Sequence, residues 1–474
     1  MMGKMYTKIA VLAVLLVAAV CLSVHALPPG GTIPGEVVLR FAPEANPDSV
    51  LEGTGASLSD SIANVHTFLA TFPTSIPVDT MVNRLRARLG VIRVQPNFKH
   101  EFPEILQMSQ SFPDQNEPTY IQDVSPTTYY DQPATSMTNA DSAALLSGGE
   151  GVVVAIIDNG MDMFHPLFEG SISTDIADFV EGDLDPSEVP GEMYGHGTFV
   201  AGIVKLMAPD VRLMPIRAFD SAGAATTFSI CQSIYWAVEH DADVINMSFS
   251  LYSNYPVIDD AINDAFQAGV VMTAAAGNDG EAVSSYPAGH DGVISVAALD
   301  SLDQLADFSN YGNDVDICAP GVNNYSALAG DYDWGRWSGT SFSAPLAAGV
   351  CALILSRDPG ATPAELHNHL RASARTEFAW GSITPPDSMY SYGCLDALHG
   401  VLSYSSGDMD ISGKLDLVDI AALISFIYLG GPPAKFAETI ADFNCDGKYN
   451  LMDLTGLISY VYLGGNDRWP CYRY

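Results

Sequence analysis

Short apolar runs alternate with longer, partly apolar segments over the middle of the chain, from residue 141 to residue 404. The short runs are rich in β-branched side chains and predict strands, whereas the segments between them carry the period of helices. The predicted strands are 152–157, 211–216, 244–247 and 270–275, and the predicted helices are 199–206, 228–240 and 258–268. This alternation is typical of an α/β fold in which helices cover both faces of a parallel sheet. Active sites in such folds lie at the carboxyl ends of the strands.

The first 26 residues have the pattern of a secretory signal peptide. Lys4 and Lys8 precede the apolar run 9–20, and Val24-His25-Ala26 supplies small residues for cleavage. Beyond this segment, no stretch approaches the roughly 18 uninterrupted apolar residues of a membrane span. We therefore expect a secreted, extracellular protein with no transmembrane helix.

Two further regions precede the α/β block. Residues 27–110 combine a strand at 36–41, a helix at 79–89 and a strand at 91–98, which predicts a small α+β module. Residues 111–140 have weak periodicity and many Pro, Gln, Thr and Asp residues, so we expect a linker or extended arm there.

Composition and charge exclude several classes of protein. The 474 residues are 48% hydrophobic, with 56 acidic and 20 basic side chains and a net charge of −36. A chain this acidic does not bind nucleic acid or an anionic membrane through bulk charge. Cys231 and Cys351 lie in apolar helical patterns and are expected to be buried free thiols, whereas Cys445 and Cys471 are close enough in sequence for a disulfide. The sequence leaves the pairing open.

Three motifs carry candidate chemistry, each at the end of a predicted element. Asp158 ends the strand 152–157, His196 opens a helix between two glycines, and Ser341 opens a helix in Gly339-Thr340-Ser341. Each residue alone is explained equally well as a turn residue or a helix cap. Together they supply an orienting acid, a base and a nucleophile, because a serine hydroxyl needs a base to take its proton. Asn278, which follows the strand 270–275, adds an amide donor for a developing oxyanion.

The same segments resemble the subtilisin-like serine proteases (subtilases) over residues 141–404, most specifically in Gly-Thr-Ser-x-x-x-Pro around Ser341 and Gly-His-Gly-Thr around His196. The resemblance implies a subtilisin-like fold and a serine endopeptidase that forms an acyl-enzyme, with polypeptide substrates and no cofactor for the chemistry. It implies that Asp158 orients His196, that Ser341 is the nucleophile and that Asn278 lies in the oxyanion hole. Its substrate-binding walls correspond to Ser248, Phe249, Ser250, Ala275, Ala276 and Gly277. Ser250 stands where the family usually has Gly.

Two alternatives accompany this interpretation. Residues 27–102 resemble a protease propeptide, since Gln95-Pro96-Asn97-Phe98 is similar to the ending of such segments, but a small accessory domain is the other explanation. The competing function is a catalytically silent homologue that acts as a calcium-dependent binding or scaffold protein.

The C-terminal block, residues 407–474, contains an internal repeat with an offset of 34 residues, as Ile424 and Ile458 illustrate. Each repeat places carboxylates and other oxygens at alternate positions around a glycine, Gly413 or Gly447, and then continues into an apolar helix. Calcium takes six to eight oxygen ligands from loops of this kind, so we expect two Ca²⁺ ions. The candidate ligands are Asp408, Asp410, Ser412, the backbone carbonyl of Lys414, Asp416 and Asp419 in the first loop, and Asp442, Asn444, Asp446, the backbone carbonyl of Lys448, Asn450 and Asp453 in the second.

This pair of loops resembles the dockerin type I module, including an Asp at position twelve of each loop. The resemblance implies a cohesin-like partner. A calcium-stabilised tail for sorting or attachment, without docking, is the alternative.

Overall fold

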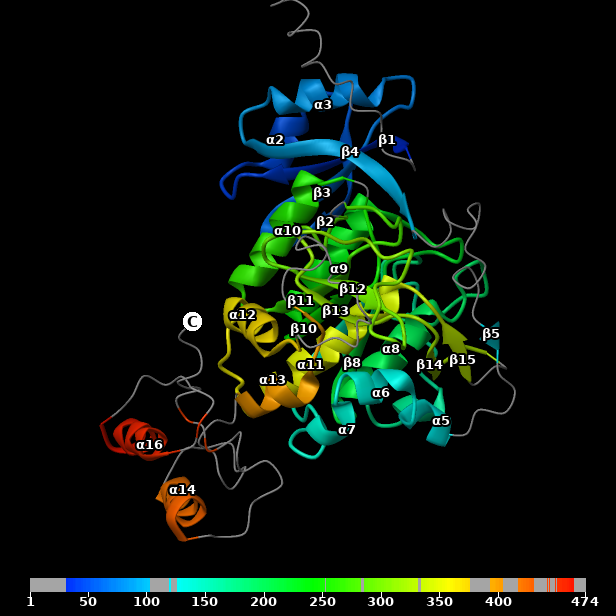
Figure 1. The fold of residues 1–474 in the computed structure, drawn as a ribbon. Coiled ribbons are helices and arrows are strands. Elements are labelled where there is room, and N and C mark those ends of the chain that lie inside the picture. Colours follow the sequence, from blue (N-terminus) through cyan, green and yellow to red (C-terminus); the bar gives the residue numbers. More distant parts are fainter. Residues whose placement is uncertain are drawn as a thin grey trace, which may run out of the picture.

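The computed structural model describes residues 31–102, 119–120, 126–251, 253–282, 285–330, 334–375, 393–403, 417–429 and 450–463, together with Ala441, Phe443 and Lys448. An N-terminal module lies at one end of a central α/β body, and the C-terminal helices lie at another edge of that body (Figure 1). The expected signal peptide, residues 1–26, is outside the described residues.

Within the described ranges, a seven-stranded parallel sheet forms the centre of the body, in the order β13-β12-β11-β10-β6-β8-β7. The strands are β6 (Val153–Asp158), β7 (Ala177–Asp178), β8 (Arg212–Arg217), β10 (Val244–Met247), β11 (Val271–Ala275), β12 (Ile294–Leu299) and β13 (Ile317–Pro320). The strands expected from the apolar runs are therefore all present, and the parallel sheet is confirmed.

The direction of each crossover decides which face a helix covers. From β6 the chain passes through the short edge strand β7 and then α8 to β8, the neighbour of β6 on one side, and from β8 through α9 it steps back past β6 to β10. Because such crossovers are right-handed, α8 and α9 lie on opposite faces. Helix α11 packs against α8, and α10 packs against α9. The helices are α8 (His196–Met207), α9 (Thr227–Glu239), α10 (Pro256–Gln267), α11 (Ala344–Arg357), α12 (Pro363–Ser373) and α13 (Ala397–Ser403).

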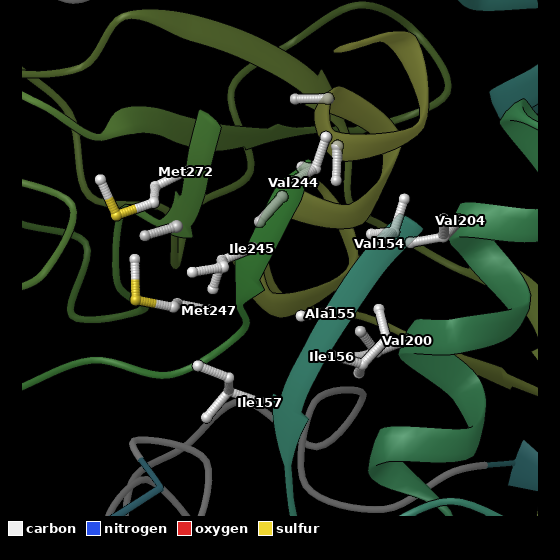
Figure 2. Packing of buried hydrophobic residues seen from close by; sticks show 14 of the residues in the cluster. Val154, Ala155, Ile156, Ile157, Val200, Val204, Val244, Ile245, Met247 and Met272 are labelled. Carbon is white, nitrogen blue, oxygen red and sulfur yellow. The ribbon is translucent and has the colours of Figure 1, made fainter. Parts of the chain in front are cut away.

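The core forms where alternate side chains of the sheet meet these helices. Figure 2 shows Val154 and Ile156 of β6 facing Val200 and Val204 of α8, and all four side chains are buried. Residues on a strand alternate between faces, so an element buried on both faces must be apolar at every position. This is why β6 is a continuous apolar run in the sequence. Cys231 and Cys351 are buried free thiols, as expected, whereas Cys445 and Cys471 lie outside the described residues.

The N-terminal module is a twisted antiparallel sheet with one amphipathic helix packed against it. Its strands are β1 (Thr32–Phe41), β2 (Ser57–Ile62), β3 (Thr67–Thr71) and β4 (Val91–Glu101), and its helices are α2 (Pro47–Leu51) and α3 (Val78–Arg86). Met81 and Leu85 of α3 pack on Leu39 and Phe41 of β1 in one buried cluster. Helix α3 ends before the expected limit at residue 89, because Gly90 turns the chain with φ of +90°.

In the segment expected to be a linker or extended arm, 111–140, the described residues 119–120 and 126–140 form short regular elements. Short helices α5 (Pro126–Tyr130), α6 (Pro133–Met137) and α7 (Ala140–Ala143) pack on the body, and β5 (Thr119–Tyr120) pairs with β15 (Trp334–Trp337), the partner of β14 (Asn324–Ala327). Tyr129 is fully buried, and its hydroxyl donates to the Gly202 carbonyl at 2.5 Å. Single side chains such as Tyr129 anchor this segment to the body. Because they follow no periodic pattern, the hydrophobic pattern of the sequence did not predict the anchoring.

The C-terminal helices α14 (Leu417–Leu429) and α16 (Leu451–Leu463) form a small core of their own. Ile420 and Leu423 of α14 pack with Leu454 and Leu457 of α16, which are the same positions of the two repeats. Leu402 of α13 belongs to the same cluster, so this core is continuous with the edge of the α/β body.

Among the described residues, the segment Thr340–Arg357 is long and apolar enough to span a membrane, but 89% of it is buried inside the protein. It is the core helix α11 together with the turn before it.

Close contact between α8 and α11 depends on Gly349. A Cβ atom at this position would lie 2.4 Å from the Met207 Cβ atom, so Gly349→Ala must push the two helices apart. We expect this change to lower the free energy of unfolding by about 1–3 kcal/mol, as overpacking typically does. Thermal unfolding of the Ser341→Ala background, which prevents digestion during heating, measures the effect.

Gly360→Ala is the matched control, because the nearest atom to its Cβ would be the Asp358 Oδ1 atom at 3.5 Å. Equal melting temperatures for the two variants would contradict this account of the helix contact.

Candidate active site

The first candidate residue, Asp158, is the last residue of the central strand β6. Its side chain is fully buried, and its Oδ1 atom accepts the Asn159 N–H at 2.8 Å. Its backbone carbonyl accepts the Ala218 N–H at 2.8 Å, which ties this strand end to the loop after β8. Strand pairing therefore fixes the position of the carboxylate at the carboxyl edge of the sheet.

The candidate base, His196, is the first residue of α8 and lies directly beside Asp158. The Nδ1 atom is 2.8 Å from the Asp158 Oδ1 atom, and both side chains are buried. A carboxylate at this nitrogen favours the tautomer that carries its proton on Nδ1 and leaves Nε2 as the basic atom.

The candidate nucleophile, Ser341, was expected to open a helix, and the structure corrects this in detail. It lies in a 3₁₀ turn, η3 (Thr340–Phe342), and the α-helix begins three residues later at Ala344. Its hydroxyl donates to the Ser248 carbonyl at 3.2 Å, and the Ser248 hydroxyl donates to the Ser341 carbonyl at 2.7 Å. The next residue, Phe342, has its ring 5.5 Å from that of His196. The turn thus places Ser341 directly before a residue that contacts the ring of His196.

Asn278 follows β11 and is held by the residue before the serine. Its Oδ1 atom accepts both the Thr340 N–H at 2.9 Å and the Thr340 hydroxyl at 2.8 Å. These two bonds determine which way the amide lies, so its NH₂ group points away from Thr340. The structure brings all four predicted catalytic positions together at one edge of the sheet.

This arrangement suits nucleophilic acyl transfer. The buried Asp158–His196 pair can take and return a proton, and Ser341 supplies the hydroxyl that attacks. The Asn278 amide and the Ser341 backbone N–H can supply donors where negative charge would develop on a carbonyl oxygen.

The residues expected to form the substrate-binding walls lie on two neighbouring strand ends, after β10 and at the end of β11. All of them are buried, and they are Ser248, Phe249, Ser250, Ala275, Ala276 and Gly277. Ser285, which no motif in the sequence indicated, connects the two walls: its hydroxyl lies 3.3 Å from the Ser250 hydroxyl and 2.6 Å from the Ala276 carbonyl. A serine in place of glycine at position 250 is thus part of a polar contact across this region.

The surface beside His196 is covered by the end of the N-terminal module, residues 97–102, which we call the tail. Strand β4 pairs antiparallel with β9 (Ala224–Thr226), and the Phe102 N–H donates to the Gly223 carbonyl at 3.0 Å. The Phe102 ring stacks on Phe219 at 4.3 Å and lies 4.7 Å from the His196 ring. Phe102 therefore shields the catalytic histidine from water.

His100 of the tail is buried two residues earlier. Its ring lies edge-on against Tyr255 at 4.6 Å, and its Nε2 atom is 2.9 Å from the Thr227 hydroxyl. Burial lowers the pKa of His100 to about 3, so the imidazole is neutral at ordinary pH while the tail lies on the body. His165, by contrast, is structural: its Nδ1 atom accepts the Leu167 N–H and its ring packs against Trp334.

Comparison with known proteins identifies this arrangement. Residues 149–393 match the model of the Subtilase family. The chain belongs to the subtilase family. Subtilases are serine endopeptidases, so the family assignment agrees with the geometry of Asp158, His196 and Ser341.

Sequence similarity between this subtilase and some of its relatives extends beyond residues 149–393. The thermophilic serine proteinase of Bacillus sp. (strain AK1) is 30% identical over 393 residues, 78% of this chain and 88% of that protein. The halolysin-like extracellular serine protease Nep of Natrialba magadii is 31% identical over 388 residues, 75% of this chain and 67% of that protein. Subtilisin amylosacchariticus of Bacillus subtilis subsp. amylosacchariticus is 35% identical over 239 residues, 48% of this chain and 61% of that protein.

A solved structure supports the fold over a similar extent. Fervidolysin from Fervidobacterium pennivorans, described as a keratinolytic enzyme related to subtilisin, superposes with a TM-score of 0.65 at 23% identity. The match covers 79% of this chain and 62% of fervidolysin.

Most of the candidate calcium ligands lie outside the described residues, namely Asp408, Asp410, Ser412, Lys414, Asp416, Asp442, Asn444 and Asp446. Asp419 and Asp453 are described, lie in the first turns of α14 and α16, and are fully buried. Lys448 is exposed, and Asn450 donates its backbone N–H to the Asp453 Oδ2 atom at 2.7 Å. Among the described residues there is no group of three metal-binding side chains.

Loss of the Asn278 amide tests the oxyanion donor. Asn278→Ala is expected to lower kcat by about 10²–10³ with little change in KM, because the amide stabilises charge present only in the transition state. The expected magnitude is the one known for the corresponding change in subtilisin itself. Steady-state hydrolysis of a peptide substrate measures it, normalised to the concentration of titratable active sites.

Asn310→Ala serves as the comparison, because the Asn310 amide donates to the loop that carries Asn278, to the Ala276 carbonyl at 3.1 Å and to the Asp279 carboxylate at 3.2 Å. If Asn278→Ala raises KM but leaves kcat unchanged, the assignment of Asn278 as an oxyanion donor is wrong.

Proposed function

We propose that this subtilase is a secreted endopeptidase that hydrolyses peptide bonds through Asp158, His196 and Ser341. The observation that carries the proposal is the buried 2.8 Å contact between Asp158 and His196, next to the turn that holds Ser341. Secretion is supported by the N-terminal apolar segment and by the name of the extracellular relative from Natrialba magadii.

The mechanism follows from the positions of these groups. The Ser341 Oγ atom attacks the scissile carbonyl carbon while the His196 Nε2 atom takes the hydroxyl proton. Asp158 stabilises the imidazolium that forms, and the Asn278 amide donates to the carbonyl oxygen as it becomes negative. His196 then returns the proton to the leaving amine, which gives an acyl-enzyme. A water molecule releases the acyl group by the same steps, with His196 again as the base.

Residues 27–102 act in this proposal as a propeptide that keeps the enzyme latent. The tail lies antiparallel to β9 and adds a strand there, which is how extended peptides bind exposed strand edges. Phe102 covers His196, so a substrate chain and the tail compete for the same surface. The matches that cover more than three quarters of the chain extend beyond residues 149–393 and are compatible with a shared N-terminal region.

Ion pairs hold the rest of the module on the body. Arg40 contacts Asp264 at 2.8 Å and Asp260 at 3.5 Å, and Arg93 contacts Asp260 at 3.2 Å, so both carboxylates come from α10. These side chains are partly exposed, so each pair contributes modestly and salt weakens it. The strand addition and the aromatic contacts of Phe98 and Phe102 therefore supply most of the docking energy.

The C-terminal block is proposed to fold around two Ca²⁺ ions. Asp419 and Asp453 occupy the last position of each twelve-residue loop, and both are fully buried, which is a costly place for a carboxylate. A cation held by these groups and by the other loop oxygens would offset that cost, so the donor set fits calcium. The ions would organise the two loops and take no part in peptide hydrolysis.

The role of this block as a docking module rests on its resemblance to dockerins. A cohesin-like partner is the binding function that this resemblance favours, and a calcium-stabilised tail is the second candidate. The packing of Leu402 into the core of the block favours neither, because it concerns the side facing the body.

Replacement of the nucleophile tests both catalysis and maturation. Ser341→Ala is expected to abolish peptide hydrolysis without loss of fold, because only one hydroxyl is removed. If residues 27–102 are removed by self-cleavage, the same variant accumulates the uncleaved precursor. Mass spectrometry of the secreted protein, with fluorophosphonate labelling of the wild type, reports the N-terminus and the reactive serine together.

Ser343→Ala is the control, since Ser343 lies next to the same turn but donates to the Ala319 and Pro320 carbonyls. Persistent turnover by Ser341→Ala would overturn the nucleophile assignment. Normal processing of this variant in a host without other proteases would exclude self-cleavage.

Calcium binding is tested in the full chain with Ser341→Ala, which cannot digest itself. We expect Asp408→Ala with Asp442→Ala to remove two calcium equivalents in titration calorimetry, because each change takes the first ligand from one loop. The same pair of changes should lower the thermal stability in calcium toward that in chelator.

The matched control is Asp48→Ala with Asp79→Ala, which removes two exposed carboxylates from the N-terminal module. Equal calcium stoichiometry for parent and Asp408/Asp442 variant would defeat the metal assignment.

A further inference from the structure

The helix that carries the catalytic histidine begins without a capping side chain of its own. Every α-helix leaves its first four backbone N–H groups without partners inside the helix, and a Ser, Thr, Asp or Asn at the N-cap usually accepts one of them. The N-cap of α8 is Gly195, which has no side chain to do this.

Glycine is required at this position for steric reasons. Its φ is +95°, a conformation that other residues rarely adopt, and a Cβ atom would lie 2.9 Å from the Leu328 Cδ2 atom. A capping residue cannot therefore be placed at 195 itself, and the cap has to come from elsewhere in the chain.

The four N–H groups at the start of α8 all have partners. The Gly195 and Thr198 N–H groups donate to the two carboxylate oxygens of Glu188, the latter at 2.7 Å. The Gly197 N–H donates to the Asn159 Oδ1 atom at 3.0 Å, and the His196 N–H to the Met193 carbonyl at 3.0 Å. Glu188 thus satisfies two of the four donors, one on each side of the catalytic histidine.

The same loop is fastened to the strand end that carries Asp158. The Met161 N–H donates to the Pro186 carbonyl at 2.8 Å. A Cβ atom on Gly160 would lie 2.6 Å from that carbonyl oxygen and 3.0 Å from the Glu188 nitrogen. Glu188 therefore links the loop after Asp158 to the first turn of the helix that begins with His196.

The chemistry of Glu188 sets it apart from a surface carboxylate. It also accepts the Thr198 hydroxyl at 2.5 Å, and it is partly buried. The pKa of Glu188 is raised to about 7, and burial is the largest cause. Repulsion by Asp158 also raises this pKa, whereas the hydrogen bonds from Thr198 and Gly195 lower it. The titratable groups near it are Asp158 and Asp162 on the loop after β6 and His196 on α8.

We propose that Glu188 is a positioning residue for catalysis: its carboxylate caps the catalytic helix in place of Gly195 and holds His196 in register with Asp158. This inference rests on the proposed triad and adds a residue outside it. The negative charge at the positive end of α8 also favours protonated His196, so it acts on the basicity of the catalytic imidazole as well as on its position.

Glu188→Gln tests both effects, because an amide keeps the size but has one acceptor and no charge. We expect kcat per titrated active site to fall by about 10-fold or more, since a small displacement of a catalytic group has a large cost, and KM to stay within about twofold. The raised pKa of Glu188 leaves this side chain only partly ionised near pH 7. Loss of its remaining negative charge should lower the pKa of His196, so the acid limb of the kcat/KM profile should move to lower pH by no more than about half a unit.

Two further variants make the result specific. Glu192→Gln removes an exposed carboxylate from the same loop and should match the wild type in kcat and in pH profile. Glu188→Asp keeps the charge but shortens the reach, so kcat should fall while the acid limb stays near that of the wild type. If Glu188→Gln does not fold, Glu188→Asp alone decides, and an unchanged kcat would overturn the proposal.

A Glu188→Gln enzyme with wild-type kcat and acid limb, even one with a lower melting temperature, would show a purely structural cap and overturn the proposal. Failure of the proposed function is a separate result, because turnover by Ser341→Ala overturns the triad whatever Glu188 does.

Discussion

The buried contact of 2.8 Å between Asp158 and His196 is the constraint on which the rest of the site depends. It requires the end of β6 and the start of α8 to approach more closely than ordinary side chains allow. A Cβ atom on Gly197 would lie 2.0 Å from the Gly160 carbonyl oxygen, so both backbones meet directly behind the pair. Two polar side chains without access to water are costly unless they have partners, and here the Asp158 Oδ1 atom serves both the His196 Nδ1 atom and the Asn159 N–H. Gly160 and Gly197 allow this approach, and the hydrogen bonds from Gly195 and Thr198 to Glu188 fasten the start of α8 beside it.

The same surface that would bind a substrate is occupied by the chain itself. Antiparallel pairing of β4 with β9 directs the tail along this surface, and Phe102 ends on the histidine ring. Strand addition fixes the direction and register of a peptide but not the identity of its side chains. In the proposed mechanism, latency and substrate binding both depend on this one strand edge, where Phe102 contacts Phe219 and His100 contacts Tyr255.

The acidic character of the chain has local consequences at both ends of the body. On α10, Asp260 and Asp264 are neutralised in part by arginines of the N-terminal module. In the C-terminal repeat, Asp419 and Asp453 are buried in equivalent first turns of helices whose apolar faces form one small core. The helix dipole stabilises carboxylates in the first turn of a helix, but this stabilisation is smaller than the cost of burying a charge completely, so a stronger counter-charge is needed. The two ends thus use cations of different kinds, side chains in one case and, as proposed, metal ions in the other.

Local pattern alone determined much of this protein. The apolar runs located β6, β8, β10 and β11, because strands buried on both faces have to be apolar throughout. The motifs around Asp158, His196 and Ser341 identified the candidate chemistry, since each stands at the end of an element where side chains converge. Only the tertiary structure decided what depends on long-range contacts: the 3₁₀ turn at Ser341, the anchoring of Tyr129, and the roles of Ser285 and Glu188. These residues are separated in sequence from the groups they contact, and the hydrophobic periodicity of a sequence does not predict individual hydrogen bonds between distant segments.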